Sequence, residues 1–338
     1  MNKNHNQSHR YLLITGLVVC LSVILLLVGV SVGSTGFETF RNVFTDPMSN
    51  QIVWLIRLPR SLGALLAGAL LGMTGAIAQG LFRNPLADPY LLGSASGASF
   101  AVALSLMMFG GSPFASYLLI RLGLTGAAFI GAVVAVLLTL LLARGVQNSL
   151  RLLLSGVIVA VIFGALSSII ALSSPDILQA MQAFLLGSTG FVSWNACGVM
   201  AIALVISLSL ALVMSRVLDG LTLGESTAAS LGLRLKSMRI SLIAVMSLTT
   251  GAAVAQVGLV AFVGLVAPHL VRSLVRVNHA RLIFLSAMMG GALLLAADIL
   301  ARGLIAPQEL PVGVLTAVLG GGYLFWLMYN GRDKRDFL

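Results

Sequence analysis

Arginine is the residue type whose spacing offers the clearest chemistry in this sequence. Arg57 and Arg60 flank a Leu-Pro pair just before a long apolar run, and Arg302 follows Asp298 by four residues near the end of another. A guanidinium group pairs well with carboxylates because its donors form a rigid fork. The three arginines are therefore either lipid-facing residues at a membrane surface or a positive outer rim that docks an acidic partner. Asp298 also has the spacing to pair with Arg302 on one helix.

The polar segment 219–236 offers a second candidate site. Thr222 and Glu225 have the spacing of a capping box, and Gly232 is suited to ending a helix. We therefore expect a helix of about two turns at about 222–232, which is too short to cross a membrane. Because so short a helix is only marginally stable in water, it either packs on its own chain or inserts into a cytoplasmic partner.

Recognisable catalytic and metal-binding motifs are missing from the sequence. The pair Lys236-Ser237 follows a leucine, whereas a phosphate-binding loop has glycine at that position. Cys20 and Cys197 lie far apart in apolar stretches, and His269 is isolated. We therefore predict no enzyme activity, no metal site and no cofactor bound by this chain.

Composition places these residues in a membrane protein. Of the 338 residues, 59% are hydrophobic and only 9% are charged, and the mean hydropathy is +1.05. A soluble domain carries about 25% charged residues. The net charge is +10, but lysine and arginine occur singly or in threes between apolar runs, not in the clusters that bind nucleic acid. The expected surroundings are membrane lipid, and no nucleic-acid partner is predicted.

The apolar runs predict the number of membrane spans. They cover residues 11–37, 61–82, 89–120, 122–143, 152–175, 177–215, 240–271 and 310–331, with a shorter run at 282–297. One span of about 20 residues per run gives roughly nine spans. Basic clusters flank the 240–271 run on both sides, and both lie in the cytoplasm only if the chain crosses twice there, turning near Gly258. We therefore predict one all-α integral membrane domain over residues 1–338, with ten transmembrane helices and both termini cytoplasmic.

Two segments depart from simple spans. Within the long run 177–215, a Ser-Pro-Asp pattern at 174–176 starts a helix and Gly187 ends it. This pattern predicts either a short outer helix that does not cross the membrane or a plain loop. The adjacent glycines 320–322 weaken a helix in mid-span and predict a bend or a flexible wall of a pathway. Glycines at spacings of three or four in other spans predict close helix packing.

Ionisable residues within the predicted spans are too few to favour ion-coupled transport. A secondary transporter would normally place them at mid-membrane, and only Asp298, toward the outer end of its span, comes near such a position. A channel would need a filter or a ring of charges, which does not stand out. A permease driven by a separate ATPase accounts for both the missing phosphate loop and the cytoplasmic helix, with ion-coupled secondary transport as the alternative.

A series of motifs in a fixed order identifies a resemblance that covers nearly the whole chain. The motifs are Arg57-Leu-Pro-Arg60, Gln79-Gly-Leu-Phe-Arg-Asn-Pro-Leu-Ala-Asp-Pro89, Arg151-Leu-Leu-Leu-Ser-Gly156, Leu223-Gly-Glu225 with Leu231-Gly232, Gly264-Leu-Val-Ala-Pro-His269, Ala296-Ala-Asp-Ile-Leu-Ala-Arg302 and Glu309-Leu-Pro-Val-Gly313. Together they resemble the permease subunits of ABC importers for iron–siderophore, haem and cobalamin, the type II importers.

The resemblance implies a set of partners and a role for each candidate residue. It implies a homodimer in the bacterial cytoplasmic (inner) membrane, two ATP-binding subunits that use the ATP, and a soluble or lipid-anchored substrate-binding protein. Arg57, Arg60 and Arg302 would meet acidic residues of the binding protein. The coupling helix would seat in the ATPase through Thr222, Leu223, Gly224, Glu225, Ser226, Leu231 and Gly232.

The resemblance also implies where the cargo passes. Asn84 and Ser149 would lie near the inner mouth of a pathway between the two copies, lined mainly by spans at about 152–172 and 312–329. The expected cargo is an iron–siderophore or haem, with cobalamin or a metal oxyanion as alternatives. ATP closure of the partner subunits would drive alternating access by pushing on the coupling helix.

Overall fold

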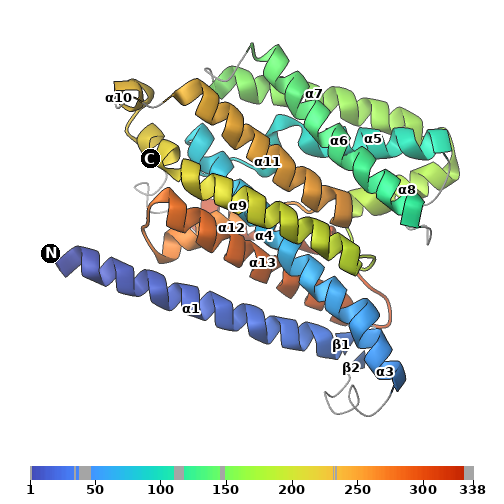
Figure 1. The fold of residues 1–338 in the computed structure, drawn as a ribbon. Helices are drawn as coiled ribbons and strands as arrows, with labels where there is room; N and C mark the ends of the chain where they lie inside the picture. Colours follow the sequence, from blue (N-terminus) through green and yellow to red (C-terminus); the bar gives the residue numbers. More distant parts are fainter. Residues whose placement is uncertain are drawn as a thin grey trace.

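The computed structural model describes residues 2–33, 36–37, 47–109, 118–144, 149–230, 232 and 234–330 as a bundle of long helices (Figure 1). Its helices are α1 (Asn2–Ser31), α3 (Pro47–Ile52), the π-helix η1 (Val53–Arg57), α4 (Leu58–Phe82), the 3-10 helix η2 (Pro89–Leu92), α5 (Ser94–Phe109), α6 (Leu118–Leu142), α7 (Ser149–Ala171), α8 (Pro175–Leu186), α9 (Trp194–Thr222), α10 (Glu225–Ser230), α11 (Leu235–Val257), α12 (Val263–Leu274), α13 (His279–Gly303) and α14 (Val312–Asn330). Two short strands, β1 (Val32–Gly33) and β2 (Gly36–Phe37), pair antiparallel. The predicted all-α class is confirmed, with this small ribbon as an addition.

Length and composition make the chain a multi-pass membrane protein. Seven helical stretches are long and apolar enough to cross a membrane: His9–Ser31, Pro47–Phe82, Gly123–Leu142, Leu150–Ala171, Trp194–Thr222, Leu235–Val257 and His279–Gly303. Three shorter apolar helices are Ser94–Phe109, Val263–Leu274 and Val312–Leu327. These stretches belong to the described part of the chain, and the count of ten spans remains a prediction.

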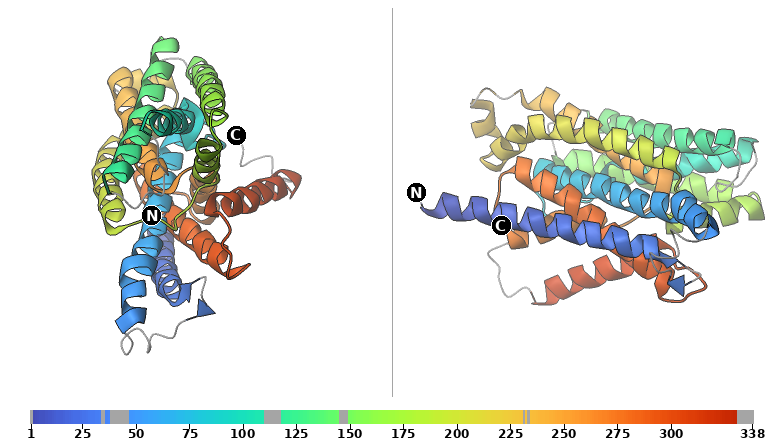
Figure 2. Two further views of the ribbon diagram at one scale, coloured as in Figure 1. Left: turned by 90° about the vertical axis from the view of Figure 1, so that its right-hand side faces the viewer. Right: turned by 60° about the horizontal axis from the view of Figure 1, so that its bottom comes forward.

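The bundle has two polar ends. At the Arg60 end, α1 runs into β1, α4 begins and α13 ends; at the Glu225 end, α4 and α9 end and α10 lies (Figures 1 and 2). The start of α1 and the end of α14 both lie at the Glu225 end (Figure 2). The two ends are opposite each other because the long helices run between them.

Helix α4 is the buried centre of the bundle, and glycine lets its neighbours approach its backbone. A Cβ atom added to Gly68 would lie 2.2 Å from the carbonyl oxygen of Gly290 on α13, and one added to Gly75 would lie 1.6 Å from that of Gly264 on α12. Any side chain at these positions would force the helices apart. The predicted close packing at small residues is therefore confirmed, and it fixes α12 and α13 against α4.

The predicted turn near Gly258 is confirmed. Helix α11 ends at Val257, Gly258 has φ +70°, and α12 begins at Val263. Glycine suits this position because the left-handed region carries no Cβ penalty for it. With only 12 residues, α12 is a short return segment, as expected from a run too short for two full spans.

The predicted short helix after residue 174 is also confirmed as α8. It runs from Pro175 to Leu186 and ends at Gly187 with φ +69°. Its end is tied to the α11–α12 turn, because Leu259 N donates to Phe184 O at 3.1 Å. Helix α8 therefore packs at the Arg60 end without crossing the bundle.

The three adjacent glycines of α14 do not interrupt the helix. Helix α14 runs unbroken from Val312 to Asn330, and the predicted bend or flexible wall of a pathway stays a prediction. Gly320 instead allows a close approach, since an added Cβ would lie 2.4 Å from Cβ of Phe262. Apart from such contacts, α14 stands off from the main bundle (Figure 2).

Candidate functional site

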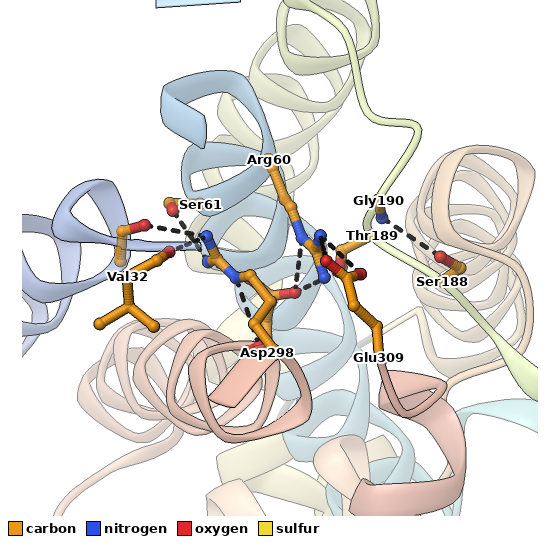
Figure 3. Close-up of polar contacts among 10 residues, drawn as sticks. Val32, Arg60, Ser61, Ser188, Thr189, Gly190, Asp298 and Glu309 are labelled. Carbon is orange, nitrogen blue, oxygen red and sulfur yellow. Dashed lines mark hydrogen bonds and ion pairs between the residues drawn. The ribbon is translucent and has the colours of Figure 1, made fainter. Parts of the chain in front are cut away.

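A buried carboxylate, Asp298, organises the Arg60 end (Figure 3). Asp298 lies on the last turns of α13 with 0% exposure. Its Oδ1 accepts from Arg60 Nε at 3.1 Å and from the Thr189 hydroxyl, and its Oδ2 accepts from Arg302 Nη2. The predicted pairing of Asp298 with Arg302 at helical spacing is confirmed, and Arg60 joins it from α4.

Arg302 ties α13 to α1 and α4. Its Nη1 donates to the carbonyl oxygens of Gly29 at 2.8 Å and Val32 at 3.2 Å, and its Nη2 donates to Ser61 Oγ at 3.1 Å. Gly29 leaves room for the approach, because an added Cβ would meet Ser61 Oγ at 2.7 Å. With 1% exposure, the guanidinium group is satisfied wholly by the protein.

Arg60 bridges two carboxylates of different exposure. Its Nη1 donates to both oxygens of Glu309, at 3.0 and 2.8 Å, in addition to the bond from Nε to Asp298. Glu309 lies in the loop between α13 and α14, and its side chain is 33% exposed. The side chain of Arg60 therefore has one buried acidic partner and one at the protein surface.

Arg57 fastens the end of α1 from the other side. It is buried, and its Nη1 donates to Ser31 O at 3.1 Å and to Val30 O at 3.4 Å. Gly33 of β1 packs on the guanidinium group, since an added Cβ there would lie 2.6 Å from an Arg57 nitrogen. Both of these hydrogen bonds end on main-chain carbonyls of α1, so Arg57 holds the backbone of that helix.

All three predicted docking arginines thus turn inward within the single chain. Arg60 and Arg302 lie against the two carboxylates of Asp298 and Glu309. Removing one partner of such a buried pair leaves an uncompensated charge and costs about 3–5 kcal/mol. The structure does not test their role in docking, which remains a prediction.

Sequence reasoning did not assign a role to Glu309, Thr189 or Ser61. Glu309 could have been singled out from the sequence, because only ten acidic residues occur in the chain and this one stands beside an apolar run. Thr189 and Ser61 carried no such signal, because each is a single hydroxyl next to an apolar helix.

The short helix at the opposite end is α10, held by an ion pair. Arg239 Nη2 on α11 lies 2.6 Å from Glu225 Oε1, and Arg83 Nη2, just after α4, lies 3.7 Å from the same oxygen. Arg239 is buried, whereas the side chain of Glu225 is 40% exposed. Helix α10 is therefore attached to its own bundle at its first residue.

The predicted capping box is wrong. Thr222 is the last residue of α9, and its hydroxyl donates to Asp219 O at 2.7 Å instead of capping the next helix. Gly224 has φ +102° and turns the chain, so α10 begins only at Glu225 and is six residues long. The capping pattern misled because α9 continues through the polar residues expected to start a new helix.

The other coupling residues form the exposed side of this turn. Ala228 is fully buried and anchors α10, while Leu223 is 62% exposed and Ser226 is exposed. Gly232 is exposed with φ +79°, as expected for a residue ending a helix. Leu231 lies outside the described residues. One side of the segment thus packs on the bundle, and the other faces outward with an apolar side chain.

The two residues expected at an inner mouth lie at this same end. Asn84 is exposed in the turn after α4, and its Oδ1 accepts from Leu86 N at 2.9 Å. Ser149 is the first residue of α7.

His269 packs edge-on to Tyr323, with ring centroids 5.8 Å apart. Within the described ranges, no three His, Cys, Asp or Glu side chains are grouped so as to hold a metal ion.

Known proteins resemble this chain over nearly its whole length. A family model described as the FecCD transport family matches residues 15–330. The hemin transport system permease protein of Yersinia pestis is 39% identical over 330 residues, covering 96% of this chain and 97% of that protein. The iron(3+)-hydroxamate import system permease protein of Bacillus subtilis is 35% identical over 330 residues, covering 95% and 83%. The vitamin B12 import system permease protein of Vibrio cholerae is 37% identical over 336 residues, covering 97% and 96%.

A solved structure resembles the fold as well. It is described as an inward-facing conformation of a metal-chelate type ABC transporter, and it superposes with a TM-score of 0.82 at 30% identity. The match covers 95% of this chain and 99% of the other.

Proposed function

Because the chain belongs to the FecCD transport family, we propose that it is the permease subunit of an ATP-driven importer for a metal chelate in the bacterial cytoplasmic (inner) membrane. The observation that carries this proposal is the similarity over nearly the whole chain to import permeases for hemin, iron(3+)-hydroxamate and vitamin B12. Their cargoes are all large metal complexes, so the proposed cargo is an iron–siderophore or haem, with cobalamin as the alternative in the same class.

The proposed topology has ten spans with both termini cytoplasmic. It is supported by the start of α1 and the end of α14 lying together at the Glu225 end (Figure 2). Basic residues gather at that end, namely Arg83, Arg144, Arg151, Arg216, Arg234, Lys236, Arg239, Arg272, Arg276 and Arg281. The positive-inside rule therefore makes the Glu225 end cytoplasmic and the Arg60 end external.

The Arg60 end is the proposed docking face for a substrate-binding protein. Arg60 suits the role best, because its second partner, Glu309, is 33% exposed and therefore replaceable. An acidic side chain of the binding protein would take the place of Glu309 on Nη1. Arg57 and Arg302 would contribute positive charge and hold the surface in shape, since both are buried and donate to main-chain carbonyls.

The Glu225 end is the proposed seat of two ATP-binding subunits. Leu223 and Ser226 face outward beside the anchored Ala228, which gives a partner one apolar and one small polar contact. ATP would be bound and hydrolysed by those subunits, and this chain would be a transport subunit without enzyme activity. Closure of the ATPase would push on α10, and Arg239 would pass the displacement to α11 through Glu225.

The proposed pathway runs between two copies of the chain. Helices α7 and α14 offer apolar outer faces for this purpose, with Val161 65% and Phe325 74% exposed. A wide apolar path suits a large chelate, and selectivity would then reside in the binding protein. Asn84 at the Glu225 end would lie near its inner mouth, with Ser149 at the start of α7.

Ion-coupled transport is disfavoured by the surroundings of Asp298. Its two oxygens already accept from Arg60, Arg302 and Thr189, so a proton or sodium ion would compete with two guanidinium groups for the same carboxylate.

The test is to purify the chain from membranes of its native host and quantify co-purifying proteins by mass spectrometry. We expect an ATP-binding subunit at one copy per copy of this chain. A Ser226→Cys variant in a Cys20→Ser background should crosslink to that subunit, whereas Ser209→Cys, exposed in the middle of α9, should not. A chain that purifies alone while uptake follows a proton or sodium gradient would contradict the proposal.

A further inference from the structure

An apolar groove lies on the outside of the bundle, away from both polar ends. Its cavity measures about 340 Å³. It is lined from α1 by Val19, Ser22, Val23 and Leu26, from α4 by Leu65, Leu66 and Ala69, from α9 by Leu204 and Leu208, and from α13 by Phe284, Ala287, Met288 and Gly291. The residues from α4 and α13 are the more buried and form the floor, while α1 forms an exposed wall. All four helices contain stretches long and apolar enough to cross a membrane, so the groove faces the interior of the bilayer.

The lining selects an apolar occupant. Ser22 is its one hydroxyl-bearing residue, and that hydroxyl already donates to Val18 O at 2.8 Å. Among its lining side chains the groove therefore offers no free hydrogen-bond donor and a single hydroxyl oxygen as acceptor, which suits an apolar ligand. Its volume falls at the low end of the roughly 300–1,000 Å³ found for ligand sites in proteins.

A guanidinium group stands at the cytoplasmic end of this groove. Arg281 precedes Phe284 by three residues and Met288 by seven, so all three lie on one face of α13. Arg281 is about 4.5 Å from Phe284 along the helix axis. Arg281 is exposed, and its Cζ lies 4.9 Å from the ring centroid of Tyr11 on α1. Stacking on the ring holds the group between the two helices and leaves the N–H donors at its edge to face outward.

We propose that the groove and Arg281 together bind one anionic phospholipid of the cytoplasmic leaflet. An acyl chain would lie in the groove, and the headgroup phosphate would accept from Arg281. Basic residues at the cytoplasmic end of a cleft between membrane helices suit acidic lipid headgroups. The site joins α1 to α9 and α13, which makes the lipid a structural link for the peripheral helix α1.

A second copy of the chain is the other possible cover for this face, and the packing argues against it. Helix α1 packs on α4 and α13, whereas α7, which offers an apolar face to a second copy, packs on α5, α6 and η2. The two surfaces lie on different sides of the bundle (Figure 1). A contact between copies through α7 therefore leaves the groove open to lipid.

The test counts lipids on the intact complex, isolated from membranes and exchanged into bilayers of phosphatidylcholine and phosphatidylglycerol. After extraction into mild detergent, the lipids that stay bound are quantified by mass spectrometry. We expect the wild type to retain phosphatidylglycerol about fivefold over phosphatidylcholine, the ratio that corresponds to about 1 kcal/mol for one arginine at an anionic surface. Arg281→Gln should abolish the preference, and Arg234→Gln, an exposed arginine before α11, should keep it.

A second pair of variants tests the groove itself. Ser22→Phe fills the cavity from α1 and should lower the retention of both lipids, whereas Ile24→Phe, exposed on the same helix outside the groove, should not. Equal lipid retention within either pair of variants would overturn the proposal. So would a disulfide between Ser22→Cys residues of two copies in a Cys20→Ser background, because it would make this face a contact between subunits.

Discussion

The two polar ends of the bundle use ion pairs in opposite ways. At the Arg60 end, Asp298 is fully buried and binds two arginines and a threonine hydroxyl. At the Glu225 end, the side chain of Glu225 is 40% exposed, and its closest partner is Arg239. Solvent weakens an exposed pair to about 0–1 kcal/mol, while a buried pair that loses a partner costs several times more. Burial, not the type of residue, makes one end rigid and the other yielding.

The two ends also differ in what their ion pairs connect. Asp298 is separated from Arg60 by 238 residues and from Thr189 by 109, so its bonds join parts of the chain that are distant in sequence. The shortest bond of Glu225 reaches Arg239, only 14 residues away, and its longer contact reaches Arg83 at 3.7 Å. The Arg60 cluster therefore joins distant parts of the chain through short buried bonds, whereas the short bond that holds α10 is made to a neighbouring segment.

The largest effect is expected from Asp298→Ala. It leaves Arg60 and Arg302 buried with one acidic partner fewer, so the free energy of unfolding should fall by about 3–5 kcal/mol. The measurement is the melting temperature in detergent, together with the yield of monodisperse protein. The loss of unfolding free energy should be smaller for Asp298→Asn, because the amide oxygen still accepts hydrogen bonds.

The matched control is Asp176→Ala, an exposed aspartate at the start of α8. Its free energy of unfolding should lie within about 0.5 kcal/mol of that of the wild type, as is usual for surface substitutions. If Asp298→Ala melted like Asp176→Ala, the buried cluster would not be the rigid end that its geometry indicates.

Local spacing accounts for what the sequence could predict. Three predicted features depend on residues within a few positions of one another. They are the pair Asp298–Arg302, the turn at Gly258 and the helix that begins at Pro175. Membrane class and helical content follow from composition. In all of these cases the deciding interaction is either local or a property of the whole chain, so no three-dimensional information was needed.

Tertiary contacts account for what the sequence could not predict. The three arginines stood out at the predicted surface, but nothing local indicated that Asp298 and Glu309 would lie beside Arg60. The helix start expected at Thr222 failed because packing of α9 against the bundle extends that helix through the polar segment. Burial depends on neighbours from distant parts of the chain, and it sets the surroundings of Arg60, Asp298 and Arg302.

An intermediate effect is expected from Glu309→Gln. The change removes the exposed acidic partner of Arg60, so stability should fall by only about 1 kcal/mol. Arg60 Nη1 would then be more available to a docking carboxylate. In the reconstituted complex, the concentration of binding protein that half-stimulates ATP hydrolysis should fall several-fold.

Arg60→Gln provides the opposite variant, since it should raise that concentration. A rise with Arg60→Gln and no change with Glu309→Gln would mean that docking uses Arg60 without displacing Glu309. No change with either variant would remove Arg60 from the docking face, and the Arg60 end would then be rigid for structural reasons alone.

The smallest effect on stability is expected from Glu225→Gln. Only the Glu225 side of the pair is exposed, but the glutamine oxygen can still accept from the buried Arg239, so the free energy of unfolding should fall by at most about 1 kcal/mol. Arg239→Gln should cost more, because Arg239 is the buried member of the pair and also packs against the bundle. If α10 couples to the ATPase as proposed, coupling should suffer nonetheless, since the charged link from α10 to α11 is lost while Ala228 still anchors the helix. Stimulated ATP hydrolysis without matching cargo uptake, measured in vesicles, would be the sign of that loss. A Glu225→Gln variant that melts as early as Asp298→Ala would instead make both ends equally rigid, and the yielding end inferred from exposure would have to be abandoned.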